Sequence, residues 1–258
     1  MTPYKKADPS KILLVDISHW QNSPTTPEKV DIDKMKSRGV SGVIMKVGQG
    51  IVLDRDFLSN FESCIQAEMP KGGYWYYDNR VDPKRQAEKC AEAAPWIYAE
   101  LGIWLDLEDR RPGVFSGWNN WYVFLSHLSE LVPNVKIGIY TGYYYWIEQT
   151  KSIGIPASSL SWFKRFPLWL AAYTEKSPMI PEPWDKYTIW QFTDLLDGQY
   201  YGVESKELDG NYFNGNAEDY IRFFDLNDVP TVPPSVEVVE KIVVVYSNGV
   251  THTYRRDK

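Results

Sequence analysis

The stretch Gly102-Ile103-Trp104-Leu105-Asp106-Leu107-Glu108 decides the fold, because it combines a buried strand with two carboxylates at the end of that strand. Its apolar run is typical of a strand that is covered on both faces in a parallel sheet. On a strand, residues i and i+2 point to the same side, so Asp106 and Glu108 face one way while Leu105 and Leu107 pack outward. The two carboxylates are therefore expected together at the carboxyl end of this strand.

Similar apolar runs alternate with helical segments on both sides of this strand. Strands are predicted at residues 11–17, 42–47, 72–77, 102–107 and 135–141. Helices are predicted at residues 28–38, 54–68, 83–100 and 116–131, the third of them kinked or broken near Pro95. Alternation of this kind predicts a parallel sheet with helices packed on it.

The pattern changes in the last third of the chain. Strands are predicted at 168–173 and 187–192, but the prolines between them (Pro178, Pro181 and Pro183) leave no room for an ordinary crossover helix. A last strand is predicted near 203–208, followed by a helix over 217–224. About five βα units and about three further strands predict an α/β fold, a modified TIM-like β/α barrel.

The domain prediction has three parts. Residues 1–226 form one catalytic barrel, 227–235 a Pro-rich linker, and 236–258 a short β-hairpin tail around the turn signal Asn248-Gly249. A lone hairpin is marginal in water. The tail is thus expected to dock on the barrel, to pair with another chain and so form an oligomer, or to be the stub of a further module.

Composition excludes some function classes. The 258 residues carry a net charge of -6, and the largest basic clusters are Arg110-Arg111 and Arg255-Arg256, so no nucleic-acid partner is expected. The aromatic content of 15%, with 11 Trp and 18 Tyr, suits core packing and also favours a glycan ligand. Cys64 and Cys90 are expected as buried thiols, with one disulfide left open.

Neither a metal site nor membrane insertion is expected. The three histidines lack metal-ligand spacing with a partner. No apolar run is long enough to span a membrane, and residues 1–8 lack the apolar region of a secretory signal. If the protein acts outside the cytoplasm, another route is expected to release it.

The pair Asp106 and Glu108 fits acid catalysis. Neighbouring carboxylates repel as anions, so one of them is expected to keep its proton to a higher pH than usual. A protonated acid beside an ionised one is what cleavage of a glycosidic bond needs. An isolated Asp-x-Glu pair is nevertheless more often the solvated end of a strand, so the catalytic interpretation needs support from other residues of the chain.

Two further carboxylates give that support. Asp16 interrupts the apolar run Leu14-Val15-Asp16-Ile17, where a charge is costly unless it is functional or serves as a buried hydrogen-bond acceptor. Asp209, in Leu208-Asp209-Gly210-Asn211, follows the last predicted strand, where a simple turn is the plainer interpretation.

Eight short motifs in order resemble the family-25 glycoside hydrolases, the lysozymes of phage endolysins, bacteria and fungi. The resemblance covers about residues 12 to 215. The motifs that carry it are Val15-Asp16-Ile17-Ser18-His19-Trp20-Gln21, Lys46-Val47-Gly48-Gln49-Gly50 followed by Asp54 and Phe57, Gly73-Tyr74-Trp75-Tyr76, Trp104-Leu105-Asp106-Leu107-Glu108, Ile139-Tyr140-Thr141, Leu170-Ala171-Ala172-Tyr173, Ile189-Trp190-Gln191-Phe192-Thr193 and Leu208-Asp209-Gly210-Asn211-Tyr212-Phe213. Trp75, Tyr76 and Gly48 depart from the family's usual residues.

The resemblance implies hydrolysis of the β-1,4 bond between N-acetylmuramic acid and N-acetylglucosamine in peptidoglycan. Glu108 is then the general acid, and Asp106 stabilises charge at the reacting sugar or orients its 2-acetamido group. Asp16 and Asp209 complete an acidic floor that positions sugar and water. The residues expected to bind the sugars are Tyr74, Tyr140, Tyr173, Trp190 and Gln191. Two carboxylates suffice for this chemistry, so no cofactor is expected.

Three rival interpretations come from other classes. They are a non-catalytic glycan-binding barrel, an assembly protein that oligomerises through the tail, and a glycosidase for another N-acetylated polymer such as chitin. Four retained carboxylates argue against the first, since a binding module has no need to keep like charges together. The missing secretory signal fits a bacterial enzyme exported by an unusual route and equally a phage endolysin. The favoured expectation is the endolysin, made in the host cytoplasm and released to the cell wall with the help of a holin.

Overall fold

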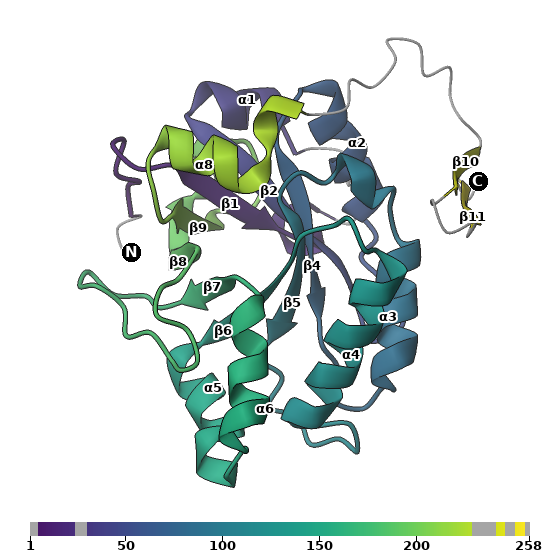
Figure 1. The fold of residues 1–258 in the computed structure, drawn as a ribbon. Coiled ribbons are helices and arrows are strands. Elements are labelled where there is room, and N and C mark those ends of the chain that lie inside the picture. Colours follow the sequence, from purple (N-terminus) through teal and green to yellow (C-terminus); the bar gives the residue numbers. More distant parts are fainter. Residues whose placement is uncertain (1–4, 24–29, 229–240, 246–250, 256–258) are drawn as a thin grey trace.

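A closed barrel with helices on its outside makes up most of the structure (Figure 1). The computed structural model describes residues 5–23, 30–228, 241–245 and 251–255. Seven strands run parallel to their neighbours in the order β1, β2, β4, β5, β6, β7 and β8, and β9 closes the ring between β8 and β1, antiparallel to both. The predicted α/β barrel is confirmed.

The strand and helix bounds follow the predicted alternation as far as β6, apart from the short strand β3, and the structure adds helices after β6. The strands of the barrel sheet are β1 (Leu13–Ile17), β2 (Val40–Gln49), β3 (Val52–Leu53), β4 (Lys71–Tyr76), β5 (Gly102–Leu107), β6 (Ile137–Gly142), β7 (Leu168–Ala171), β8 (Ile189–Asp197) and β9 (Glu207–Phe213). The α-helices are α1 (Ile32–Ser37), α2 (Phe57–Gln66), α3 (Pro83–Glu92), α4 (Trp118–Leu131), α5 (Tyr143–Gln149), α6 (Ala157–Trp162), α7 (Gly198–Tyr201) and α8 (Ala217–Phe224). Short 3-10 helices lie at η1 (His19–Gln21), η2 (Trp96–Tyr98), η3 (Lys151–Ile153), η4 (Phe163–Arg165) and η5 (Leu226–Asp228).

The helix predicted over 83–100 is shorter, for a local reason. Asp82 caps its start by accepting from the backbone N–H groups of Lys84 and Arg85, and Pro83 fits the first turn. Pro95 disfavours helical geometry at the residue before it, so α3 ends at Glu92 and a separate turn, η2, follows. The expected break near Pro95 is confirmed.

The last third departs from regular βα units, as expected. No helix lies between β7 and β8 in this described stretch. The strand predicted near 203–208 is misplaced, because the backbone of residues 204 and 205 donates to Gln21 and the ladder begins only at Glu207. Asp209 is therefore inside β9, so the prediction that it follows the last strand is wrong.

An aromatic plug fills the barrel interior beneath its carboxyl-end mouth. The Trp169 ring makes edge contacts with Tyr140 and Trp104, at centroid distances of 4.7 and 5.9 Å. Gly138 makes room for this packing, since a Cβ there would lie 2.3 Å from the Trp104 ring. Replacing a buried ring of this kind by Ala costs about 3–5 kcal/mol.

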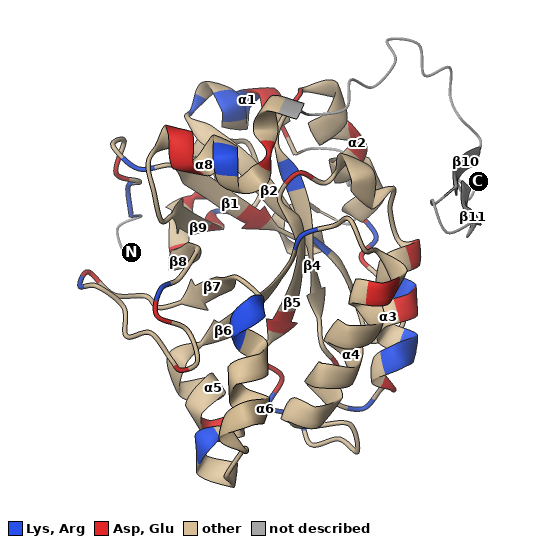
Figure 2. Cartoon of the chain, viewed as in Figure 1, with Lys and Arg blue, Asp and Glu red and all other residues tan. Residues whose placement is uncertain are grey.

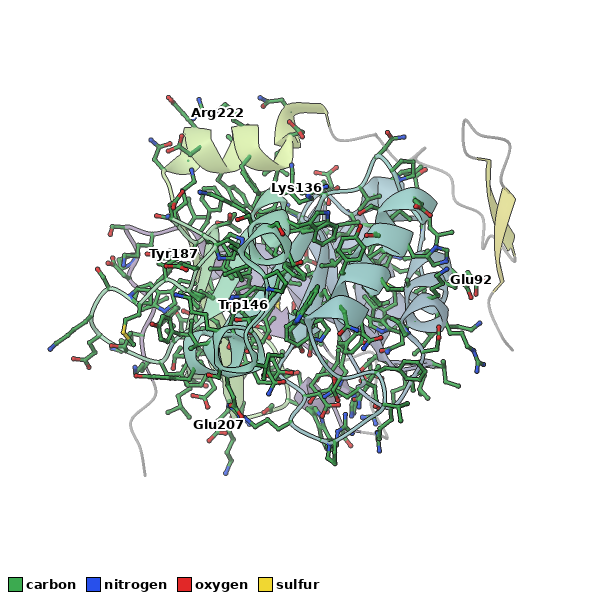
Figure 3. The ribbon with its side chains drawn as sticks, turned by 60° about the horizontal axis from the view of Figure 1, so that its bottom comes forward. Glu92, Lys136, Trp146, Tyr187, Glu207 and Arg222 are labelled. Atoms are coloured by element: carbon green, nitrogen blue, oxygen red, sulfur yellow. The ribbon has the colours of Figure 1, made fainter. Side chains whose placement is uncertain are left out.

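A second apolar layer lies between the barrel and the helices. Leu105 and Leu107 belong to it, as the strand alternation predicts. Trp146 of α5, labelled in Figure 3, stacks on Trp121 of α4 with ring centroids 5.8 Å apart and contacts Trp184 at 4.6 Å. No described helix has both the length and the apolar composition needed to cross a membrane.

The tail contains a pair of antiparallel strands, β10 (Lys241–Val245) and β11 (Thr251–Arg255). The predicted linker lies largely, and the turn at Asn248-Gly249 entirely, outside the described residues. The domain boundaries stay predictions.

Candidate active site

Four carboxyl side chains from three strands line one cavity of about 170 Å³ at the mouth of the barrel. Asp16 comes from β1, Asp106 from β5, Glu108 from the position just after β5, and Asp209 from β9. The other lining residues are Tyr74, Tyr140, Trp169, Tyr173 and Gln191. Figure 2 shows acidic segments on β1 and β5, inside a barrel whose other charges lie mostly on helices and loops.

Asp16 and Asp209 are direct partners in the antiparallel ladder between β1 and β9. Asp16 is only 6% exposed and accepts hydrogen bonds from Asn211 Nδ2 at 2.8 Å and Gln191 Nε2 at 3.1 Å. A further side-chain hydrogen bond joins the two aspartates, which requires a proton between them. Because the amide donors favour an anion at Asp16, the shared proton belongs to Asp209.

The pKa values of both aspartates are raised. Burial raises the pKa of Asp16 to about 6, against the lowering effect of its two amide donors. Burial, followed by the negative charge of Asp16, raises the pKa of Asp209 to about 9. Near neutral pH the pair therefore holds one negative charge and one proton.

Gln191 has a fixed orientation. Its Oε1 accepts hydrogen bonds from the hydroxyls of Tyr140 at 2.9 Å and Tyr173 at 3.0 Å. With the oxygen engaged twice, the amide nitrogen must point to Asp16. Behind it, the Trp169 indole donates to Asn211 Oδ1 at 2.7 Å and orients the second amide in the same way.

Asp106 and Glu108 form the second carboxyl pair. Burial raises the pKa of Asp106 well above its ordinary value, the charge of Glu108 adds to this, and Lys46 opposes it. Asp106 is 4% exposed, and its Oδ1 has no hydrogen-bond partner among the described residues. Glu108 stands at the rim with much of its surface open to solvent, yet enough protein surrounds its carboxyl for burial to raise its pKa as well. Glu108 lines the cavity together with Asp16, Asp106 and Asp209.

Comparison with known proteins identifies the family. Residues 15–201 match the sequence profile of Glycosyl hydrolases family 25. The chain belongs to glycosyl hydrolase family 25. It is therefore a glycoside hydrolase.

Individual relatives agree with this assignment. The hydrolase is 25% identical over 229 residues to Lysozyme M1 of Streptomyces globisporus, covering 82% of this chain and 70% of that protein. It shares its fold with a bacterial lysozyme from Streptomyces coelicolor (TM-score 0.67, 24% identity, 85% of this chain and 98% of the other). The CTP1L endolysin has the same fold (TM-score 0.60, 21% identity, 84% of this chain and 70% of the other).

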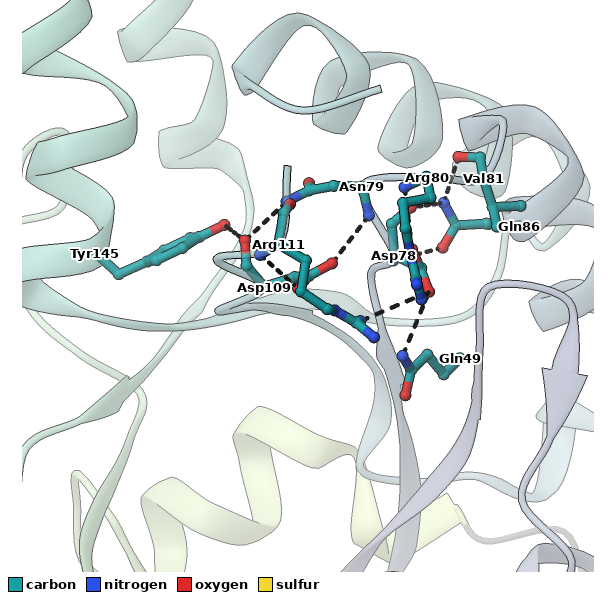
Figure 4. Close-up of polar contacts among 9 residues, drawn as sticks. All are labelled: Gln49, Asp78, Asn79, Arg80, Val81, Gln86, Asp109, Arg111 and Tyr145. Carbon is teal, nitrogen blue, oxygen red and sulfur yellow. Dashed lines mark hydrogen bonds and ion pairs between the residues drawn. The ribbon is translucent and has the colours of Figure 1, made fainter. Parts of the chain in front are cut away.

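A network of ion pairs holds the two loops beside Glu108 of the hydrolase (Figure 4). Asp109, the next residue, accepts from Arg111 Nε at 2.6 Å and from the backbone N–H of Asn79 at 3.2 Å. Arg80 pairs with Asp78, whose pKa these hydrogen bonds hold below its usual range. The network joins the loops after β4 and β5 and so fixes the backbone that presents Glu108.

A larger hollow of about 750 Å³ begins at Glu108, Tyr140 and Tyr173 and extends over the first turn of α5 and the loop after β7. Tyr144 on its wall is 72% exposed. Flat aromatic surface beside a polar cavity suits sugar rings, so the hollow can hold a polymer that continues beyond the cavity. Another hollow, of about 670 Å³, lies between α4, η4 and α8 and contains none of the four carboxyls.

The structure does not bring Trp190 to the cavity. Its indole donates to the Ala172 carbonyl at 2.7 Å, and its ring contacts Tyr187 and Tyr212 in the outer layer. The other residues expected at the site do line the cavity.

Sequence reasoning missed Trp169, Asn211 and Lys46. The alternation of strand faces could have indicated Asn211, which lies two residues after Asp209. Within the described residues, no group of His, Cys, Asp or Glu has the geometry of a metal site.

Proposed function

We propose that this family-25 hydrolase is an N-acetylmuramidase that cleaves the β-1,4 bond between N-acetylmuramic acid and N-acetylglucosamine in peptidoglycan. The observation that supports this is the cavity itself, in which four carboxyls with raised pKa values face one another at the start of an extended hollow. A site of this kind can donate a proton and stabilise a positive charge in the same place.

Glu108 acts as the general acid in this proposal. It stands at the rim, where the cavity meets the larger hollow, and burial favours its protonated form. The glycosidic C–O bond breaks as the Glu108 proton moves to the leaving oxygen. The carboxylate that remains can then take a proton from the water that completes hydrolysis.

Asp106 stabilises the charge that develops at the reacting sugar or orients its 2-acetamido group. The free Oδ1 of Asp106 can accept a hydrogen bond from the amide N–H of that group. Asp16 and Asp209, with Gln191, form the floor that positions sugar and water. The rings of Tyr74, Tyr140 and Tyr173 bind the sugar, and Trp190 is left out of this role because of its place in the outer layer.

We further propose that the enzyme is a phage endolysin that reaches the cell wall after a holin opens the membrane. The shared fold with the CTP1L endolysin supports this origin. No contact described for residues 241–245 and 251–255 supports oligomerisation through the tail.

The test follows reducing ends and turbidity on purified peptidoglycan with wild type, Glu108→Gln and Asp16→Asn. Glu207→Gln is the matched control, because Glu207 lies exposed on β9 away from the cavity. We expect wild type and Glu207→Gln to release muramic acid reducing ends and Glu108→Gln to be slower by about 10²–10⁴-fold. Binding without release on walls of several chemotypes would instead support a glycan-binding module, and release from chitin alone another glycosidase.

A further inference from the structure

Lys46 is a cation whose charge acts on both Asp106 and Glu108. The strands of the barrel contain two lysines within their described residues, Lys46 and Lys71. Lys71 is paired with Glu100 at 3.0 Å and stacks on Phe61 of α2, away from the cavity. Ile44 is buried inside the barrel in one cluster with Trp104, Tyr140 and Trp169, and Lys46 lies two residues further along β2, so Lys46 points to the same side, toward the mouth.

The Lys46 ammonium is held by an aromatic ring rather than by an anion. Its Nζ lies 5.2 Å from the centre of the Tyr76 ring, and the Arg111 guanidinium lies 5.6 Å from that centre. Tyr76 is the register partner of Asp106 between β4 and β5. In the part of the chain that the structure describes, Lys46 makes no hydrogen bond or ion pair, and Asp106 Oδ1 has no hydrogen bond either.

An unpaired ammonium beside two carboxyls acts on them through its charge. Because no ion-pair partner neutralises this half-buried cation, its positive charge acts on the other charged groups around it. The charged or titratable groups that line the cavity are Asp16, Tyr74, Asp106, Glu108, Tyr140, Tyr173 and Asp209, and Tyr76, Asp109 and Arg111 lie around Lys46 and Glu108. Most of these are acids, and Arg111 is bound to Asp109, so Lys46 is the free positive charge among them.

We propose that Lys46 is a positioning residue that sets the pH range of catalysis by holding its charge on the Tyr76 ring beside Asp106 and Glu108. This inference rests on the proposed muramidase function only for its consequence in catalysis. In agreement with it, the positive charge of Lys46 lowers the pKa of both carboxyls, against burial, which raises both. Asp109 has the opposite sign and raises the pKa of Glu108.

The first experiment titrates the carboxyls by NMR in protein labelled with ¹³C at the Asp and Glu carboxyl carbons, with Asp106→Asn and Glu108→Gln to assign the signals. In Lys46→Met we expect both midpoints to rise by about 1–2 pH units. Lys46→Arg should keep the wild-type midpoints, because the charge remains. Lys89→Met, which removes an exposed lysine of α3, is the matched control and should leave them unchanged.

Asp109→Asn should move the Glu108 midpoint downward, in the opposite direction to Lys46→Met. If Lys46→Met does not fold, Lys46→Gln replaces it, with folding checked by circular dichroism. Unchanged midpoints in a folded, charge-removed variant would overturn the proposal.

The second experiment measures kcat and KM on peptidoglycan as a function of pH. We expect the pH profile of Lys46→Met to move upward and that of Lys46→Arg to stay in place. A higher KM with an unmoved profile would show that Lys46 binds substrate instead, and would overturn the inference. If the titration midpoints of Asp106 and Glu108 shift in Lys46→Met but the wild-type enzyme releases no sugar, the inference about Lys46 stands and the proposed function fails.

Discussion

Asp16 and Asp209 face each other across the ladder between β1 and β9 and share a proton. The two strands come from opposite ends of the barrel sequence. Asp16 has two amide donors, from Gln191 and Asn211, and Asp209 has none among the described contacts. The pair is thus unequal, with an anion at Asp16 and a protonated acid at Asp209.

This inequality predicts different effects of two similar substitutions. The Asn amide at position 209 can donate to Asp16 as the protonated acid does, so we expect Asp209→Asn to keep kcat within about tenfold of wild type. Asp16→Asn removes the anion and leaves two amide donors facing a third amide, and should lower kcat by about 10²-fold or more. Steady-state kinetics on peptidoglycan measures both, with Asp185→Asn as an exposed control. Equal losses would contradict the assignment of the proton.

The raised pKa of Asp209 also predicts a dependence of stability on pH. Its ordinary value is 3.8 and its folded value about 9, so between these values the unfolded chain releases a proton that the folded chain retains. This contribution favours the folded state below pH 3.8 and is lost progressively as pH rises toward 9.

The amide side chain in the Asp209→Asn variant cannot ionise, so the variant does not lose stability in this way as the pH rises. We expect its melting temperature to exceed that of wild type by about 2–6 °C at pH 8, with a smaller difference at pH 4. Thermal unfolding at several pH values tests this, and a difference that does not change with pH would contradict it.

The two tyrosines that donate to Gln191 predict a non-additive effect. In Tyr140→Phe or Tyr173→Phe, the other hydroxyl still holds Gln191 Oε1, so each single change should lower kcat/KM by less than about tenfold. The double variant frees the amide to turn away from Asp16 and should lose more than the product of the single effects. A double-mutant cycle measures this, and Tyr122→Phe is a control on the outer surface. Strict additivity would show that Gln191 is held by other contacts.

Trp169 and Trp190 provide a matched pair for separating function from stability. Trp169 lines the cavity and orients Asn211, so Trp169→Phe should lower kcat or raise KM. Trp190→Phe loses a hydrogen bond to Ala172 in the outer layer and should cost about 1 kcal/mol of stability with kinetics unchanged. Kinetics and denaturant unfolding of both variants provide the comparison. A kinetic defect in Trp190→Phe without loss of stability would show that Trp190 takes part in substrate binding or catalysis.

Much of the site follows from the alternation of strand residues. The placement of Asp106 and Glu108 needs only the i, i+2 spacing, and Asp16 is indicated by one charge within an apolar strand. The same rule could have separated Trp190 from Gln191, because adjacent strand residues face opposite sides and both cannot enter one cavity.

Other features depend on contacts that are distant in sequence. Asp209-Gly210-Asn211 has the local composition of a turn, and only its pairing with β1 makes it a strand. Lys46 was visible as part of a motif, but its relation to the carboxyls depends on the Tyr76 ring of a neighbouring strand. The helices α5 and α6, between residues 142 and 167, were not predicted, because a Tyr-rich segment and Pro156 obscure their period.

The antiparallel strand β9 has a consequence for the synthesis of the enzyme. The hydrogen bond between Asp16 and Asn211 spans 195 residues, so the two sides of the floor leave the ribosome at different times, β1 well before β9. Chains lengthen at about 5–20 residues per second, and domains fold as units. Between the synthesis of β1 and that of β9 the enzyme therefore lacks a complete cavity. A nascent or prematurely ended chain that stops before β9 carries the general acid Glu108 but has no floor on which to hold a sugar.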